Sequence, residues 1–208
     1  MFKSVTPPIT GWLEVDVDKP TLEYLNERID AAHSEIFYED VKNRLAGHIS
    51  SSLSLVDVDN KFHNNFLIEC ANEYDKAFPH AHRIVNHTNT SRNLVLNGFW
   101  VNYQNKHEFN PPHSHGGVFS FVIWIKIPTY HKDQSNLEFL KGQGHSVASS
   151  FEMSYTDTTG RTCPYIYEMN PDMEGKMLFF PSTLRHSVYP FYECDDTRIS
   201  ISGNLYYA

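Results

Sequence analysis

The sequence has few cysteines and no long apolar run. Its 208 residues include three cysteines, Cys70, Cys163 and Cys194, which are widely spaced and form no CxxC pattern. This usage argues against a disulfide framework or a zinc knuckle and favours a reducing, cytoplasmic setting. The first residues lack an apolar signal segment, and no stretch approaches the roughly 18 apolar residues of a membrane span. We therefore expect neither export nor a membrane partner.

Positive charge is also in short supply. The formal net charge is −8, from 17 Lys and Arg against 25 Asp and Glu, which argues on electrostatic grounds against a nucleic-acid partner. With 40% hydrophobic residues the chain can bury one sizeable core, and it contains no internal repeat. We therefore expect a single domain over residues 1–208. The sequence leaves the oligomeric state open.

Helical and extended patterns occupy different parts of the chain. After a strand at 9–17, apolar residues at helical spacing predict three helices, at about 18–33, 34–49 and 60–77, and a linker or short strand at 50–56. From Leu94 onward the pattern changes to strands. The predicted strands are 94–103, 118–127, 136–140, 146–155, 163–168, 176–180, 187–191 and 198–206.

The connections between these strands contain glycine-rich turns, including Asn97-Gly98 and Gly116-Gly117, as antiparallel sheets require. Helices followed by about eight strands predict a mainly β fold, with a jelly-roll core and N-terminal α-helices. Within the single domain, residues 1–90 form a mostly helical elaboration and residues 91–208 the β core.

Three of the twelve histidines suggest a metal site. His113 and His115 precede a strongly apolar strand, and side chains at i and i+2 of an extended chain leave the same face. His186 adjoins a later strand, so three imidazoles are available for a non-haem metal. The alternative is a pair of loop histidines beside a turn. His145 is ambiguous, and we interpret the other eight as surface or hydrogen-bonded polar residues.

Arg198 and Ser200 suggest a carboxylate site. They lie two residues apart in a predicted strand and offer a fork of N–H donors and a hydroxyl on one face. An unpaired arginine in a core strand is costly unless an anion meets it. The alternative is an exposed edge residue, or an ion pair with Asp195 or Asp196.

The second half of the chain resembles a known superfamily. The motifs are Phe99-Trp100-Val-Asn102-Tyr103, His113-x-His115-Gly-Gly, Phe-Phe-Pro181-Ser-x-x-x-His186 and Arg198-x-Ser200. Over roughly residues 94–206 they look like the 2-oxoglutarate- and Fe(II)-dependent oxygenases, in particular the branch found in bacteria and tailed phages. The resemblance implies a double-stranded β-helix (cupin-like jelly roll) as the catalytic core, in a bacterial or phage-infected host cytoplasm.

The resemblance also implies an activity. The protein would be a dioxygenase that uses Fe(II), 2-oxoglutarate and O₂, hydroxylates an unidentified substrate, and converts 2-oxoglutarate to succinate and CO₂. His113 and His186 would be iron ligands, and His115 stands where the superfamily has a carboxylate. Glu108 and Asp133 are spare carboxylates with less suitable spacing.

The cosubstrate residues follow from the same resemblance. Arg198 and Ser200 would bind the distal carboxylate of 2-oxoglutarate. Tyr103 falls near a tyrosine that many members use for this cosubstrate, with Asn102 beside it. Because adjacent strand residues face opposite ways, only one of the two can line the cavity.

Two other interpretations remain open. A cupin-type metalloprotein that does not use 2-oxoglutarate also fits HxH with a distal histidine, although the glutamate that cupins place shortly after HxH is absent. Val118, Phe119 and Ser120 occupy that region. The other is a non-catalytic jelly-roll module with incidental histidines.

Overall fold

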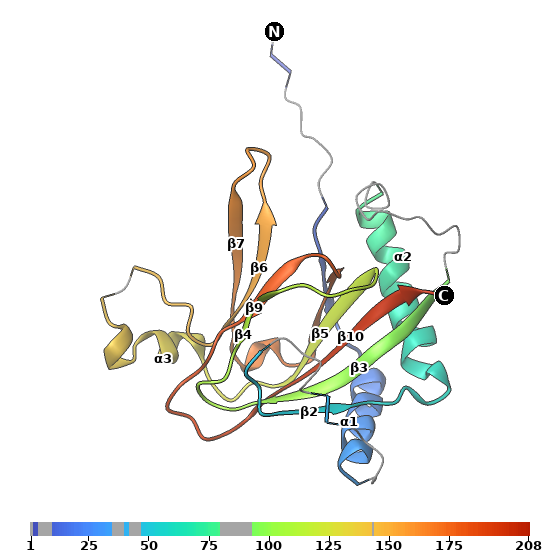
Figure 1. Cartoon of the computed structure of the whole chain (residues 1–208), viewed down its shortest axis with the longest axis horizontal. Coiled ribbons are helices and arrows are strands. Elements are labelled where there is room, and N and C mark those ends of the chain that lie inside the picture. Colours follow the sequence, from blue (N-terminus) through green and yellow to red (C-terminus); the bar gives the residue numbers. More distant parts are fainter. Residues whose placement is uncertain (1, 4–9, 35–39, 42–46, 80–92, 143) are drawn as a thin grey trace.

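Two antiparallel sheets face each other in the computed structural model, which describes residues 2–3, 10–34, 40–41, 47–79, 93–142 and 144–208 (Figure 1). The larger sheet has the order β1 (Leu13–Asp16), β8 (Lys176–Pro181), β5 (Phe119–Lys126), β10 (Arg198–Tyr207), β3 (Leu94–Gln104), β2 (Ser51–Ser54). The smaller has the order β4 (Asn110–His113), β9 (Arg185–Val188), β6 (Ser150–Thr156), β7 (Thr162–Glu168). The expected mainly β fold, a double-stranded β-helix with N-terminal helices, is confirmed.

Two helices cover the outer face of the larger sheet. Helix α1 (Lys19–Ser34) begins where the Asp18 carboxylate accepts a hydrogen bond from the Thr21 backbone N–H at 2.9 Å. Helix α2 (Ile68–Ala77) follows 3₁₀ and π-helical turns at Val58–Asn60 and His63–Leu67. The helices predicted at about 18–33 and 60–77 are therefore confirmed.

Strand alternation divides the interior into two cores. In β5, Phe119, Phe121 and Ile123 pack towards the helices, and Val122 and Trp124 pack between the sheets. The outer core also contains the fully buried helical residues Leu25 and Tyr74, and the inner core contains Phe151 and Met153 of the smaller sheet. Because the two faces of β5 pack into different cores, this strand is buried only where the helices cover one face and the smaller sheet covers the other.

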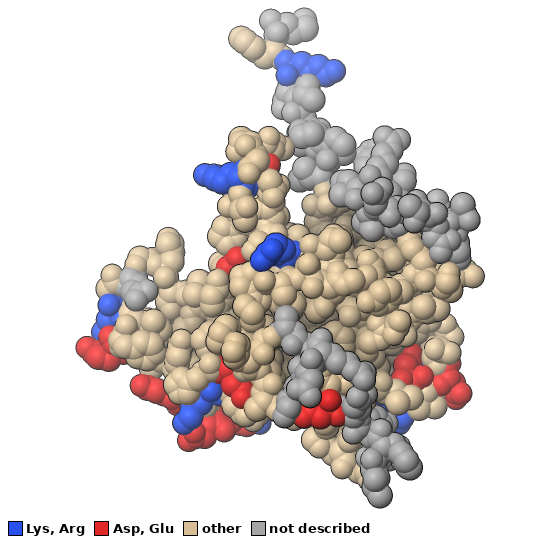
Figure 2. Space-filling model, in the orientation of Figure 1, with Lys and Arg blue, Asp and Glu red and all other residues tan. Residues whose placement is uncertain are grey.

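Figure 1 also shows the β6–β7 hairpin extending beyond the body of the molecule. On the face in Figure 2, Lys and Arg are scattered, and most Asp and Glu gather towards the lower edge. The described residues thus form no continuous basic surface on this face.

None of the helices in the described ranges has the length and apolarity of a membrane span.

Several predicted elements differ from the structure. Residues 136–140 are not a strand, because the short helix α3 (His131–Ser135) leads into a 3₁₀ turn at Glu138–Leu140. Their alternating apolar residues lack a sheet to pack on, and the side chain of Phe139 is 57% exposed. The strand predicted at 146–155 begins only at Ser150, because Ser149 has φ 55°, outside the extended region.

The helix predicted at about 34–49 lies largely on residues 35–39 and 42–46, outside the described residues. Of its described positions, Asp40 and His48 form isolated β-bridges with Leu53 and Phe109 rather than helical turns. The short strand within 50–56 is present as β2. Of the strand predicted at 9–17, the structure contains β1 at Leu13–Asp16, and residue 9 lies outside the described residues.

Candidate metal and cosubstrate site

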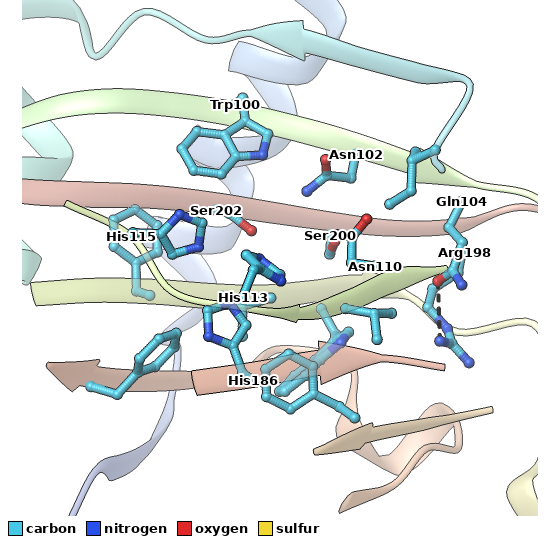
Figure 3. A pocket seen from close by; sticks show the side chains of 17 residues that line it. Trp100, Asn102, Gln104, Asn110, His113, His115, His186, Arg198, Ser200 and Ser202 are labelled. Carbon is cyan, nitrogen blue, oxygen red and sulfur yellow. Dashed lines mark hydrogen bonds between the residues drawn. The ribbon is translucent and has the colours of Figure 1, made fainter. Parts of the chain in front are cut away.

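The structure brings together the three histidines of the HxH…H pattern. His113 ends β4 and pairs directly with His186 of β9, and His115 lies two residues further along the chain. One ring nitrogen of each lies within 4.8 Å of the other two. The ring centroids are 4.3 to 5.1 Å apart, and Figure 3 shows the rings converging on one end of a pocket between the sheets.

Backbone carbonyls set the tautomers of two of these rings. The Nδ1 atom of His113 lies 2.7 Å from the Pro111 carbonyl oxygen, and Nδ1 of His186 lies 3.0 Å from that of Leu184. A carbonyl only accepts hydrogen bonds, so each Nδ1 carries the proton and each Nε2 keeps its lone pair. Histidine metal ligands usually have this support behind the ring.

Burial keeps the three imidazoles neutral. Desolvation, with a smaller contribution from His113, lowers the pKa of His115 to about 4 and that of His186 to about 3. The pKa of His113 is also lowered, mainly by burial. Since only a neutral imidazole has a lone pair for a metal, all three can act as ligands at neutral pH.

Close backbone packing positions the turn after His115. The His115 backbone N–H donates to the Ser182 carbonyl oxygen at 2.8 Å, and Val118 N–H donates to that of Leu205 at 2.7 Å. Gly117 has φ +98°, and a Cβ there would lie 2.7 Å from the Leu205 carbonyl oxygen. Only glycine fits this angle and this space without strain, so Gly117 lets the chain pass from the turn after His115 into β5.

Arg198 lies at the opposite end of the pocket from His115, with Ser200 between them (Figure 3). Its side chain is 2% exposed, and burial lowers its pKa to about 10, so it is still charged at neutral pH. Its Nη1 donates to Gln104 Oε1 at 3.1 Å and its Nη2 donates to Ser149 Oγ at 2.5 Å. Its Nε is buried without a hydrogen-bond partner among the described residues.

The ion pair considered for Arg198 does not form. Asp195 pairs with Lys106 at 2.5 Å and Asp196 with Lys126 at 2.7 Å, and Arg198 pairs with no carboxylate of the described residues. A buried, uncompensated guanidinium is costly, and a ligand carboxylate offsets that cost directly. The pocket therefore has one end suited to a metal and the other suited to an anion.

Paired residues of two strands connect these ends. Strands β3 and β10 are in register so that three pairs face the pocket. The pairs are Trp100–Ser202, Asn102–Ser200 and Gln104–Arg198. The Asn102 side-chain oxygen accepts a hydrogen bond from Ser52 Oγ at 2.8 Å, which leaves its amide N–H groups for the pocket.

Tyr103 differs from the prediction. It lies on the opposite face of β3, packs against the outer core and is absent from the pocket lining. Its hydroxyl is 2.6 Å from His33 Nε2 of α1. Strand alternation admits only one of Tyr103 and Asn102 to the pocket, and Asn102 lines it.

Several residues of the pocket region were not among the predicted site residues. Gln104 and Ser149 hold Arg198, and Asn110 lines the wall between the sheets. The spacing of Gln104, two residues after Asn102 in one strand, was a signal that could have found it. Ser149 is distant in sequence and has no such signal.

The two spare carboxylates do not reach the histidines. Glu108 accepts hydrogen bonds from the backbone N–H groups of Ser50 and Asn105, at 3.1 and 2.8 Å. Asp133 is exposed on α3. Among the described residues no carboxylate lines the pocket.

His131 is also buried but lies outside the histidine cluster. Its Nδ1 is hydrogen-bonded to the Ala148 carbonyl oxygen at 2.7 Å, as expected of a polar core residue.

Comparison with solved structures gives the class of fold. A Pseudomonas putida prolyl-4-hydroxylase is similar with TM-score 0.54 and 11% identity, covering 96% of this chain and 94% of that chain. OsALKBH1 is similar with TM-score 0.50 and 11% identity, covering 97% and 100%. At these identities the likeness shows a shared double-stranded β-helix. A search of curated proteins found no match.

The family is given by a sequence model. The model described as "Putative 2OG-Fe(II) oxygenase" matches residues 98–204, just over half of the chain. The chain therefore belongs to this family of 2-oxoglutarate- and Fe(II)-dependent oxygenases. It is an oxidoreductase that uses Fe(II), 2-oxoglutarate and O₂ on a substrate that is still unidentified, which confirms the class of enzyme that the motifs indicated.

Proposed function

We propose that His113, His115 and His186 hold Fe(II), and that Arg198 and Ser200 bind the distal carboxylate of 2-oxoglutarate. The observation that carries this proposal is one pocket with three neutral imidazoles at one end and, at the other, a buried cation that pairs with no carboxylate of the described residues. Imidazole is a common ligand of non-haem iron, and a guanidinium is suited to a carboxylate.

The donor set fits the metal without a carboxylate. Nε2 of His113 and of His186 is left free by the carbonyls behind the rings, and His115 follows on the same short segment. Three neutral ligands contribute no negative charge, so the iron site would be one charge more positive than a site with a carboxylate ligand. That extra positive charge favours an anionic cosubstrate. 2-Oxoglutarate has a carboxylate at each end. One carboxylate would lie beside the metal, and the other would lie beside the Arg198 guanidinium.

The chain's own residues orient the cosubstrate and restrict water. When bound, Fe(II) with 2-oxoglutarate would supply the oxidising chemistry, in which O₂, 2-oxoglutarate and a substrate C–H group give succinate, CO₂ and a hydroxylated product. Arg198 and Ser200 would set the far end of the cosubstrate, and Asn102 would donate to its middle. Trp124, Phe151 and Phe180 form an apolar wall beside His186 that limits access of water.

We also propose that residues 1–90 and 91–208 fold as one domain. The first part supplies β1 and β2 to the larger sheet as well as the two helices that bury its outer face. Because the N-terminal part completes the larger sheet and covers its outer face, these contacts support a single domain.

Anaerobic titration tests the site. Wild-type protein should bind one Fe(II) per chain, and adding 2-oxoglutarate should produce a visible charge-transfer absorption band. His186→Gln should lose the iron while keeping its unfolding temperature, because two remaining ligands compete poorly with water.

His131→Gln is the matched control. Its imidazole is also buried and also donates from Nδ1 to a backbone carbonyl, but it lies outside the histidine cluster. It should bind iron as wild type does. Equal iron content in His186→Gln and wild type would remove His186 from the ligand set. Iron binding with no response to 2-oxoglutarate would instead support a cupin-type metalloprotein.

A further inference from the structure

Gln104 is held by a set of contacts that leaves its side chain one orientation. Its Nε2 donates to the carbonyl oxygens of Glu108 at 2.6 Å and Tyr189 at 3.3 Å, and its Oε1 accepts from Arg198 Nη1 at 3.1 Å. Turning the amide over would set its oxygen against two carbonyl oxygens and its NH₂ against a guanidinium. With the side chain 3% exposed, the contacts direct Oε1 at Arg198 (Figure 3).

Within the described part of the chain, the two hydrogen-bond partners of the Arg198 guanidinium are both neutral. The second is the hydroxyl of Ser149, which also contacts Thr129 Oγ1 at 2.8 Å. The ring of Phe191 lies under the guanidinium at 5.1 Å, a favourable contact that leaves the charge in place. The guanidinium is thus fixed at two nitrogens and stacked on an aromatic ring, while its charge is balanced by no carboxylate of the described residues.

A glutamate at position 104 would have nearly the same shape and the opposite effect. Its carboxylate would pair with Arg198 and neutralise the pocket. One of its oxygens would also face the Glu108 and Tyr189 carbonyls, with no proton to donate to them. Only the amide combines a donor for these carbonyls with an uncharged acceptor for the guanidinium.

We propose that Gln104 is a positioning residue that determines cosubstrate specificity, because it orients Arg198 without neutralising its charge. The charge is then reserved for a ligand with a distal carboxylate. This inference rests on the proposed function, in which that ligand is 2-oxoglutarate.

The test compares two ligands by anaerobic calorimetry on the Fe(II)-loaded protein. The second ligand is 2-oxopentanoate, which has the same five-carbon chain and the same 2-oxo acid end but no distal carboxylate. Wild type should prefer 2-oxoglutarate by roughly 100-fold or more, as expected of a shielded, charge-assisted contact. In Gln104→Glu the affinity for 2-oxoglutarate should fall by about the same factor, with 2-oxopentanoate affinity within about threefold of wild type, so the preference disappears.

Two further variants separate charge from shape. Gln104→Met removes the hydrogen bond and adds no charge, so 2-oxoglutarate should bind about 5- to 10-fold more weakly and still be preferred. Gln134→Glu is the matched control, because Gln134 is a buried glutamine that donates to the Tyr192 carbonyl at 2.9 Å and accepts from its N–H at 2.7 Å, without contacting Arg198. It should keep the wild-type preference.

The possible outcomes separate a failure of the Gln104 proposal from a failure of the proposed cosubstrate site. A wild-type protein that binds neither ligand would overturn the proposed cosubstrate site. A wild type with the expected preference, together with a Gln104→Glu protein that keeps it, would overturn the role of Gln104 alone. Should Gln104→Glu fail to fold, Gln104→Met decides, since wild-type affinity for 2-oxoglutarate in that variant would also overturn the role.

Discussion

The two faces of the larger sheet differ in what their side chains do. In β3 and β10, the outward residues Val101 and Ile201 are fully buried under the helices. Their immediate neighbours Asn102, Ser200 and Ser202 face the pocket. A step of one residue along a strand therefore moves from a position that stabilises the fold to one that lines the pocket, and mutations at adjacent positions should have separable effects.

Removing the outer cover should have the largest effect. A fragment of residues 91–208 would expose the outward side chains of the sheet, including Val101, Ile123 and Phe179, and would lose β1 and β2. The lost apolar burial exceeds the net stability of a domain, which is about 5–15 kcal/mol. We expect no cooperative unfolding transition by circular dichroism or calorimetry. A fragment that unfolds cooperatively and binds Fe(II) would contradict the single-domain proposal.

Arg198→Met should change ligand binding and spare the fold. Losing a charge-assisted contact in a shielded pocket costs roughly 2 to 5 kcal/mol, so 2-oxoglutarate affinity should fall by about 30- to 5000-fold. Stability should hold or rise, because a buried charge that has no carboxylate partner in the described part of the chain is replaced by an apolar side chain of similar length. Anaerobic calorimetry with 2-oxoglutarate measures the first effect and thermal unfolding the second. Unchanged affinity would make Arg198 a structural residue.

Ile201→Ala should do the reverse. The side chain is fully buried in the outer core, and truncation of such a residue costs about 3 kcal/mol of unfolding free energy. Denaturant unfolding should show this loss, while the affinities for Fe(II) and 2-oxoglutarate stay at wild-type values. Ser200→Ala, one residue earlier on the pocket face, is the control, with weaker 2-oxoglutarate binding and little change in stability. Parallel effects in the two variants would mean that the faces are coupled.

The smallest effect is expected from Tyr103→Phe. It removes only the hydroxyl that meets His33 of α1, so the cost in stability should be about 1 kcal/mol or less. The affinity for 2-oxoglutarate, measured by the same calorimetry, should not change, because Tyr103 lies outside the pocket lining. A clear loss of affinity would return Tyr103 to the cosubstrate site.

Much of the fold could be read from local patterns. The change from helical spacing to alternation near Leu94, together with turn glycines, predicted the β core and its helical cover. The HxH…H and Arg-x-Ser motifs indicated candidate site residues, which the structure places around one pocket. The segment 136–140 shows the limit of that reasoning, because alternation is a signal of a strand only where a sheet buries one side. Contacts between distant segments leave no local pattern, which is why Ser149 beside Arg198 was missed.

The sequence by itself determined that Arg198 would lie in a strand and that the three histidines would lie beside strands. It also determined that only one of Asn102 and Tyr103 could reach the cavity. Alternation requires this of any extended segment. Which of the two faces the pocket was decided only in the tertiary structure. Helix α1 packs on the outer face, where Tyr103 meets His33, and the smaller sheet closes over the other face. The same packing decided that Asp195 and Asp196 pair with lysines and do not pair with the buried Arg198, because ion pairs depend on distances between segments that their sequence positions do not fix.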